Sequence, residues 1–296
     1  MGLLTLIFAV QLLALFHSPD ENLHIIACDV GQGDAILVVY GQTQILVDGG
    51  PGRGVVDCLT THMPFTDKKI EAIILSHPQK DHYGGLIDVL NAYEVGVFIA
   101  TPLDSSSQDY QVLKEEVGGK GVRVVNPDRG MVIRFGLIQL EILHPSAEYI
   151  LSESVLVDES KKLSGEDVLG AYTTNKDPND FSVVAVLKYK DFDALLTGDI
   201  GPEISDQIAK SLSLGPKVEW EYIKIPHHGS KNGLSGKLLD AVSPQVAVIS
   251  AGKNNSYGHP HQEIIKMLSD KGVRILRTDE GGDVEVVTDG EKIYIR

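Results

Sequence analysis

The chain has 296 residues, of which 43% are hydrophobic, so it is long enough and apolar enough to bury a sizeable core. Its formal net charge of -15 excludes a nucleic-acid binder that works through a broad basic surface, because neutralising phosphates requires clustered Lys and Arg. A nucleic-acid substrate would therefore have to be held locally, for example through a bound metal.

The N-terminal segment begins with MGLLTLIFAVQLLALF, which is apolar apart from Thr5 and Gln11. This run is shorter than the roughly 20 residues that a membrane-spanning helix needs. No Lys or Arg precedes it and no A-x-A site follows it, which argues against a cleavable signal. We interpret residues 1–22 as a hydrophobic signal or membrane-anchor segment, and a buried first helix is the alternative. This interpretation predicts a membrane-associated or exported protein and leaves a cytoplasmic location open.

From His24 onward, short runs rich in Val and Ile alternate with turn residues. HIIACDV, AILVVY and TQILVDGG predict three successive strands that form a β-meander. A helix is expected near residues 54–62, followed by the strand IEAIILS and a second helix that begins after Gly85. A helix over about 107–117 and the strands VRVV, MVIRF and LIQLEILHP complete the first half.

Residues 146–178 lack a sustained apolar period and predict a long surface insertion, in which AEYILSESVL could form a short helix. The strands SVVAVLKYK and DALLTGD follow, and helices then alternate with strands to the C-terminus. Both halves therefore run from paired strands into alternating helices and strands. This order predicts one domain over residues 23–296, built as two sheets sandwiched between helices.

The two cysteines, Cys28 and Cys58, show neither CxxC spacing nor a disulfide framework. We interpret them as two small buried hydrophobic residues. The two cysteines therefore do not indicate whether the protein functions in an oxidising or a reducing compartment.

Acidic and histidine side chains follow the ends of successive predicted strands. These residues are Asp48, His77, Asp199, His227, His228 and His259. Ligands bind at the carboxyl ends of strands in layered α/β folds, so these side chains are expected to converge on one cleft. Each residue alone has a simpler interpretation as a turn former or a surface residue, but their joint placement favours a functional site.

The segment SHPQKDHYGG, residues 76–85, indicates that this cleft binds metal. Its H-x-x-x-D-H spacing can place His77 on one side of a metal pair and Asp81 with His82 on the other. Asp199 could bridge the two ions. Imidazole and carboxylate ligands suit zinc, manganese or iron, and catalytic sites keep one position open for water.

Seven segments together resemble the metallo-β-lactamase superfamily, and more specifically its ComEC-type branch of competence hydrolase domains. They are DVGQGDA (29–35), ILVDGG (45–50), SHPQKDHYGGL (76–86), NDFSVV (179–184), LLTGDI (195–200), IKIPHHGS (223–230) and NNSYGHP (254–260). The resemblance implies an α/β fold, the αβ/βα four-layer sandwich of two mixed β-sheets flanked by helices. It also implies a metal site at the edge between the sheets and hydrolysis of a nucleic-acid phosphodiester.

The resemblance also implies a ligand set. His77, Asp81, His82, Asp199 and His228 fall on metal-binding positions, and Asp48 falls on an early Asp that orders the metal loop without ligating. The sequence departs from the superfamily at Gln79, where a histidine is common, and at Asn179 and Asp180, where another histidine is expected. The first metal site is therefore weakened, with His77, Asp180 and Asp199 as its donors. The second, formed by Asp81, His82, Asp199 and His228, is intact.

These assignments predict a metal-dependent phosphodiesterase or nuclease that uses metal-activated water, with one or two divalent ions per chain, zinc or manganese being favoured. Asp81 or Asp180 would orient or deprotonate the water, and His227 or His259 would contact the phosphate or protonate the leaving oxygen. Lys224 and Lys231 are candidates for phosphate contacts, with solvated surface lysines as the alternative.

Two rival interpretations stay open. A metallo-hydrolase of the same fold could act on small esters such as lactones, phosphocholine esters or thioesters, and the acidic net charge favours a small or locally gripped substrate. The other is a non-catalytic binding domain of the same fold, in which Gln79 in place of a ligating histidine reflects the loss of turnover. The expected partners are a phosphodiester substrate such as single-stranded DNA and, through the resemblance, a membrane or DNA-uptake machinery.

Overall fold

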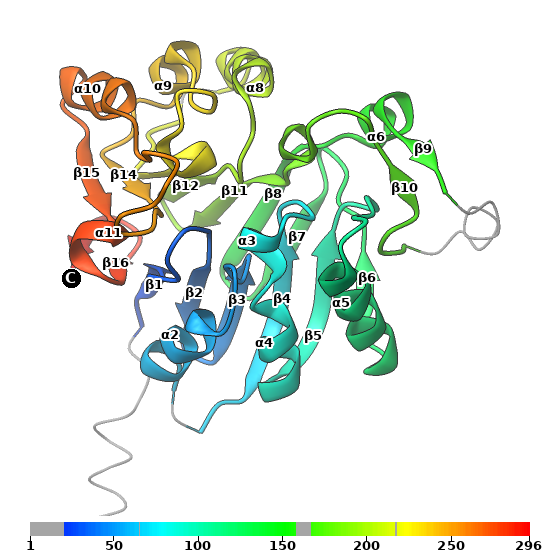
Figure 1. Ribbon diagram of the computed structural model, residues 1–296. Helices are drawn as coiled ribbons and strands as arrows, with labels where there is room; N and C mark the ends of the chain where they lie inside the picture. The colour runs from blue at the N-terminus through cyan, green and yellow to red at the C-terminus, as the bar shows by residue number, and fades with distance from the viewer. Residues whose placement is uncertain (1–20, 65, 158–166, 217) are drawn as a thin grey trace, which may run out of the picture.

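The computed structural model describes residues 21–64, 66–157, 167–216 and 218–296 (Figure 1). The predicted hydrophobic segment at residues 1–22 lies outside this part of the chain except for its last two residues. Across the described ranges, no helix is both long enough and apolar enough to cross a bilayer.

The first large sheet contains the predicted N-terminal meander. Its strand order is β17-β16-β1-β2-β3-β4-β5-β6, with β3 to β6 parallel and the other neighbours antiparallel. The strands are β1 (Leu23–Ala27), β2 (Ile36–Tyr40), β3 (Thr43–Val47), β4 (Lys69–Leu75), β5 (Glu94–Ala100), β6 (Arg123–Val125), β16 (Val284–Thr288) and β17 (Ile293–Ile295). The C-terminal strand β16 pairs with β1, so the two ends of the described chain meet in one sheet.

The second large sheet is also mixed. Its order is β15-β14-β13-β12-β11-β8-β7, with β12 to β15 parallel and the other neighbours antiparallel. Its strands are β7 (Val132–Phe135), β8 (Ile138–His144), β11 (Val184–Tyr189), β12 (Phe192–Leu196), β13 (Tyr222–Lys224), β14 (Val246–Ile249) and β15 (Arg274–Arg277). Each sheet therefore has one parallel half, whose strand ends can carry a site.

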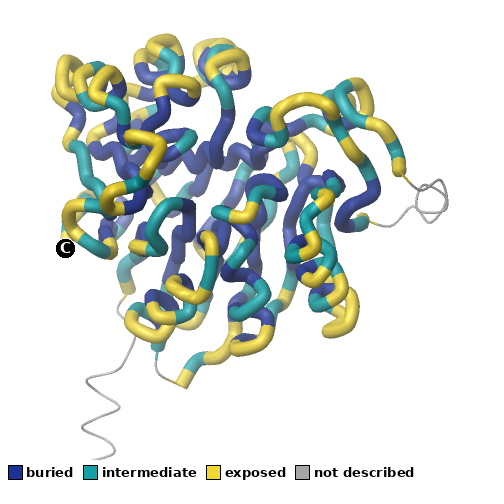
Figure 2. Tube along the Cα trace, in the orientation of Figure 1, coloured by how far each residue is buried: buried dark blue, intermediate teal, exposed yellow. Residues whose placement is uncertain are grey.

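The helices cover the outer faces of the two sheets. They are α2 (Gly54–His62), α3 (Lys80–Tyr83), α4 (Leu86–Ala92), α5 (Gln108–Gly119), α6 (Ala147–Glu153), α8 (Pro202–Leu214), α9 (Gly236–Val242), α10 (Gln262–Asp270) and α11 (Thr278–Gly281), with the 3₁₀ turns η1 (Pro178–Phe181) and η2 (Pro226–Gly229). Helices α2, α4 and α5 pack on the first sheet, and α8, α9 and α10 pack on the second. Their exposed residues face outward (Figure 2).

Three apolar layers hold the elements together. The central layer lies between the two sheets and draws residues from both, such as Val38, Ile74, Leu140 and Leu196. One further layer lies between each sheet and its helices. Strands β4, β11 and β14 are buried almost throughout, which explains their near-continuous apolar sequences. The predicted fold, two mixed sheets flanked by helices, is confirmed.

The expected surface insertion contains the short predicted helix as α6, followed by a two-stranded sheet of β9 (Val155–Leu156) and β10 (Tyr172–Thr173). Ile150 of α6 packs with Leu103 and Phe181 in a small apolar cluster. Residues 158–166 of the insertion lie outside the described residues.

The interpretation of the cysteines as separate buried residues is wrong, because Cys28 and Cys58 form a disulfide. Helix α2 packs over the end of β1 and brings the two Cα atoms to 5.9 Å, within the range that a disulfide spans. The sequence does not reveal this pairing because the two cysteines are 30 positions apart. A loop of this length predicts a stabilisation of about 3–4 kcal/mol through the unfolded chain.

Candidate metal centre

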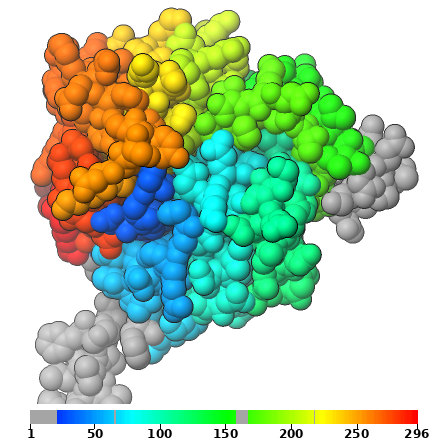
Figure 3. Space-filling view, viewed as in Figure 1, coloured from blue at the N-terminus to red at the C-terminus, as the bar shows by residue number. Residues whose placement is uncertain are grey.

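The predicted strand-end residues come together between the parallel halves of the two sheets. Asp48 follows β3 and His77 follows β4, both in the first sheet, while Asp199 follows β12 and His228 follows β13 in the second. His259 lies beyond β14, and its ring centroid is 6.3 Å from that of His228. Segments far apart in the sequence, coloured blue, cyan, yellow and orange, accordingly meet on one face of the molecule (Figure 3).

The loop after β4 turns directly into the short helix α3, which carries Asp81 and His82. The Gln79 carbonyl accepts hydrogen bonds from the backbone N–H groups of His82 and Tyr83 and so fixes the first turn. Segment 29–35 packs against this turn, and a Cβ at Gly33 would overlap the carbonyl oxygen of Asp81. Glycine at position 33 thus permits the close approach that places the neighbouring Asp34 in the site.

Three buried imidazoles share one hydrogen-bonding pattern at their Nδ1 atoms. His82 Nδ1 is 2.8 Å from Asp48 Oδ2, and His228 Nδ1 is 3.0 Å from the Ser250 carbonyl oxygen. His77 Nδ1 is 3.0 Å from Ser76 Oγ. Partners at Nδ1 orient each ring and leave its Nε2 atom available to a ligand, the arrangement usual for metal-binding histidines.

The other ring nitrogens converge. In the described part of the chain, the Nε2 atoms of His77, His82 and His228 are buried and have no hydrogen-bond partner. Oδ2 of Asp199 lies 3.2 Å from Nε2 of His82 and 3.2 Å from Nε2 of His228. Two ligand atoms of one tetrahedral zinc ion lie about 3.3 Å apart, given bonds of about 2.0–2.1 Å. The donor set and its converging nitrogens therefore fit a divalent cation.

The donors fall into overlapping groups. His77, His82 and Asp199 form one group and Asp81, His82 and His228 another, each with potential ligand atoms within 4.8 Å of one another. Asp81 Oδ2 is 3.5 Å from His228 Nε2, and a third of the Asp81 side chain is exposed (33%). The site is thus closed by buried imidazoles on one side and reaches solvent at Asp81.

Asp180 does not join these groups. None of the groups of three candidate donors found among the described residues contains it. It lies in η1, and its carboxylate packs beside Gly201. Burial raises the pKa of Asp180, and Asp177 adds to this effect. Among the described residues, His77 and Asp199 thus group with His82 and not with Asp180. The half-buried Gln79 stands in the metal loop as the sequence indicated.

Asp34 is a site residue that sequence reasoning missed. Its carboxylate is buried and makes ion pairs with Lys224 Nζ and, at 3.3 Å, with His228 Nδ1. Asp34, Asp199 and His228 form a further candidate donor group, as do Asp34, Asp48 and His82. The available signal was its place in DVGQGDA, directly before the buried strand β2.

Lys224 is neither a surface lysine nor placed to contact a phosphate. Its side chain is 1% exposed, and Nζ lies 3.4 Å from Asp199 Oδ1 in addition to its ion pair with Asp34. Lys224 is therefore the internal counter-ion of the two buried carboxylates. Lys231, by contrast, is exposed.

His227 and His259 lie at the edge of the buried cluster, with ring centroids 5.7 Å apart. Both are partly exposed, and the Tyr257 ring stacks on His259. His227 and His228 have positive φ angles of 51° and 53°, a strained backbone conformation, and their ring centroids are 6.3 Å apart. Burial lowers the pKa of His259 to about 4, and nearby histidines contribute.

Burial and charge act in opposite directions on the central residues. Burial lowers the pKa of His77 to about 3. Burial would also lower the pKa values of His82 and His228, but the buried carboxylates, Asp199 foremost, raise both well above the usual value. Burial would raise the pKa of Asp199, but His228, His82 and Lys224 hold it well below its usual range.

These shifts predict a pH-dependent metal affinity. The metal-stripped protein holds protons on His82 and His228 that a cation must displace, so affinity should rise with pH by about tenfold per unit for each proton released. Without metal, the paired imidazolium groups stabilise the fold below the unfolded histidine pKa of about 6.5, and this contribution is lost as pH rises through their raised pKa values. Competition with a chromogenic chelator between pH 6 and 8 measures the affinity. An affinity that does not change over this range would contradict the prediction.

The comparisons with known proteins agree with this geometry. Residues 28–253 match the model of the metallo-beta-lactamase superfamily, and the chain belongs to this family of metal-dependent hydrolases. It is 27% identical to ComE operon protein 3 of Bacillus subtilis over 87% of this chain and 32% of that protein. It is 26% identical to competence protein ComA of Neisseria gonorrhoeae over 94% of this chain and 35% of that protein. The chain thus spans about a third of the length of these curated relatives.

Among solved structures, the fold resembles the metallo-beta-lactamase fold protein YhfI of Bacillus subtilis. The TM-score is 0.54 at 10% sequence identity, covering 89% of this chain and 99% of that one. At this identity the likeness concerns the fold alone.

Proposed function

We propose that this chain is a metal-dependent phosphodiesterase that cleaves nucleic-acid phosphodiesters. The observation that carries the proposal is the convergence of three buried Nε2 atoms, of His77, His82 and His228, on a centre that also contains Asp199. Burying three imidazoles and a carboxylate together without a ligand would cost free energy, because these polar groups are all removed from water.

Asp81, His82, Asp199 and His228 would hold a divalent cation, zinc or manganese, with His77 and Asp34 as further donors if a second ion binds. Such a cation, when bound, acidifies water and stabilises negative charge on a phosphoryl oxygen. Asp48 and the Ser250 carbonyl would keep the imidazoles of His82 and His228 in the ligating orientation through their Nδ1 atoms.

The remaining roles belong to residues at the rim. Asp81 combines a low pKa, of about 2, with partial exposure. Burial raises this pKa, but the contact with His228 and the charges of His82 and His228 together outweigh burial. Asp81 is therefore an ionised carboxylate at neutral pH that can orient an attacking water. His259, neutral at this pH, can donate a hydrogen bond to a phosphate oxygen, and His227 is placed beside it for the leaving oxygen. We assign no step to Asp180.

The choice of a nucleic acid as substrate is supported by a relative named as a competence protein, ComA, and fits a role in DNA uptake, at or across a membrane. The net charge of -15 argues that the substrate is gripped at the metal centre and not over a broad surface. That charge also favours the second candidate, a hydrolase of small esters.

The deciding experiment compares substrates on one preparation. Full-length protein, stripped of metal and reloaded separately with zinc or manganese, is tested on end-labelled single-stranded DNA, on bis(p-nitrophenyl) phosphate and on p-nitrophenyl carboxylate and phosphocholine esters. We expect cleavage of DNA and of the phosphodiester, dependent on added metal. Hydrolysis of the small esters alone would favour the second candidate. Metal binding with no turnover of any substrate would indicate a non-catalytic domain.

A further inference from the structure

A second cluster of potential metal ligands surrounds the disulfide. Cys58 and His62 lie one turn apart on α2, so their side chains share one face of the helix. Asp283 directly precedes β16, and Cys28 directly follows β1, and these two strands pair from Ala27 and Val284 onward. Helix and strands thus bring together side chains from four separate positions of the chain.

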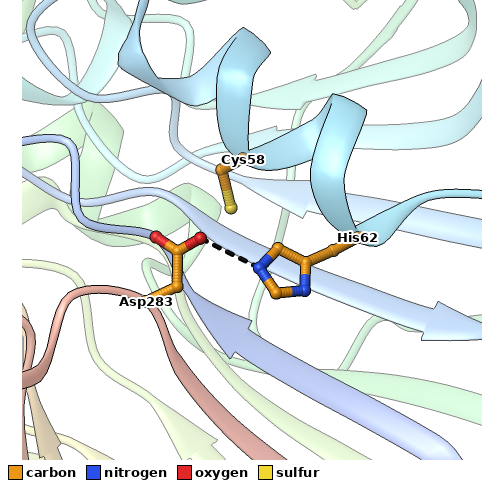
Figure 4. A group of neighbouring side chains, drawn as sticks. All are labelled: Cys58, His62 and Asp283. Atoms are coloured by element: carbon orange, nitrogen blue, oxygen red, sulfur yellow. Dashed lines mark hydrogen bonds and ion pairs between the residues drawn. The ribbon is translucent and has the colours of Figure 1, made fainter.

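The contacts inside this cluster are close. His62 Nε2 and Asp283 Oδ2 are 2.9 Å apart, and ligand atoms of Cys58, His62 and Asp283 lie within 4.8 Å of one another. Figure 4 shows the sulfur of Cys58 pointing toward the space beside the carboxylate of Asp283 and the ring of His62. The second sulfur, of Cys28, is bonded to that of Cys58.

The surroundings suit a structural cation. Asp283 Oδ1 accepts a hydrogen bond of 2.7 Å from the backbone N–H of Asp29, which orients the carboxylate and leaves Oδ2 facing His62. The cysteines are buried, whereas His62 and Asp283 are 20% and 29% exposed, so an ion can enter from solvent. Two thiolates, one imidazole and one carboxylate form a tetrahedral donor set that zinc prefers.

We propose that, when the disulfide is reduced, Cys28, Cys58, His62 and Asp283 bind one zinc ion. The site is separate from the proposed catalytic centre, which contains no cysteine, and the inference does not depend on the proposed function. The disulfide and the zinc ion exclude each other. A zinc ion holds two sulfurs about 3.8 Å apart, given bonds of about 2.3 Å, whereas bonded sulfurs lie about 2.0 Å apart.

Replacement of the disulfide by zinc takes two steps, reduction and metal binding. A dithiol reductant supplies two electrons and two protons, the S–S bond breaks to give two thiols, and the reductant becomes its own disulfide. Zinc then replaces the two thiol protons, which pass to solvent. It also displaces the proton between His62 Nε2 and Asp283, which passes to solvent or to Nδ1 of the same ring. The oxidised chain would therefore link α2 to the end of β1 through the disulfide, and the reduced chain would link them through the zinc ion.

Cobalt provides the test, because thiolate ligands give Co²⁺ a charge-transfer absorption that imidazole and carboxylate ligands do not. Tag-free full-length protein is prepared oxidised or reduced with a phosphine, which does not compete for metal as a dithiol does, and each form is titrated with Co²⁺ and then with Zn²⁺. We expect the charge-transfer band in the reduced form only, its bleaching by Zn²⁺, and about one more equivalent of zinc in the reduced form.

Variants separate this site from simple thiol binding. His62→Ala and Asp283→Asn keep both cysteines and the disulfide, so their oxidised forms should fold, and each should weaken cobalt binding in the reduced form by at least about tenfold. The matched control is His24→Ala, which removes a histidine–carboxylate pair with Glu285 on the same two strands. Absence of the band from reduced protein, or a band and affinity unchanged in His62→Ala, would overturn the proposal.

Discussion

Asp199→Asn is expected to lower kcat/KM for phosphodiester hydrolysis by more than the roughly 10–100-fold that loss of an outer-shell partner costs a metal site. The substitution keeps the size of the side chain and removes the carboxylate oxygen that lies 3.2 Å from Nε2 of both His82 and His228. The group of His77, His82 and Asp199 loses its only carboxylate, and the group of Asp34, Asp199 and His228 loses one of two, so metal content should fall with activity.

Folding should survive this change. Without Asp199, His82 and His228 can lose their protons at neutral pH, and Lys224 retains Asp34 as its partner. Elemental analysis, circular dichroism and kinetics on one preparation therefore separate metal loss from unfolding. Asp193→Asn is the matched control, because it makes the same chemical change on the same strand, β12, outside the donor groups. Full metal content and wild-type kinetics in Asp199→Asn would refute the assignment of this centre.

The fold was predictable because its signals are local. Continuous apolar runs predicted strands such as β4 and β14, and turn residues marked their ends. The convergence of Asp48, His77 and Asp199 was predictable for a related reason, since carboxyl ends of parallel strands share an edge. The sequence-specific resemblance then supplied the pairing of the two sheets, which composition and periodicity alone could not.

The features that were missed all depend on contacts between distant segments. The residues next to Lys224 in the sequence do not indicate that its ammonium group is buried against Asp34. Lys224 ends β13 of the second sheet, whereas Asp34 lies in the loop before β2 of the first. Cys28 and Cys58 are joined only because α2 returns over the end of β1. The assignment of Asp180 came from its motif and stays a prediction: its carboxylate lies beside Gly201, and none of the candidate donor groups found among the described residues contains it.

Lys224→Met should destabilise the protein by about 3–5 kcal/mol, the usual cost of removing one partner from a buried ion pair. Methionine matches the length of the lysine side chain, so the main change is loss of the cation that pairs with Asp34 and Asp199. Urea unfolding of the metal-stripped protein at neutral pH measures the loss. Lys188→Met removes a half-exposed pair with Glu141 and should cost at most about 1 kcal/mol.

The double variant Asp34→Asn/Lys224→Met tests whether the cost comes from an uncompensated buried charge. It removes both members of the pair, so it should be more stable than Lys224→Met alone, and the double-mutant cycle gives the coupling free energy. In Lys224→Met, stability should fall but metal affinity should not, because loss of the positive charge beside Asp199 favours binding of a divalent cation. A variant that folds less stably yet binds metal at least as tightly would identify Lys224 as an internal counter-ion. Equal stability of Lys224→Met and wild type would show that the buried pair contributes nothing.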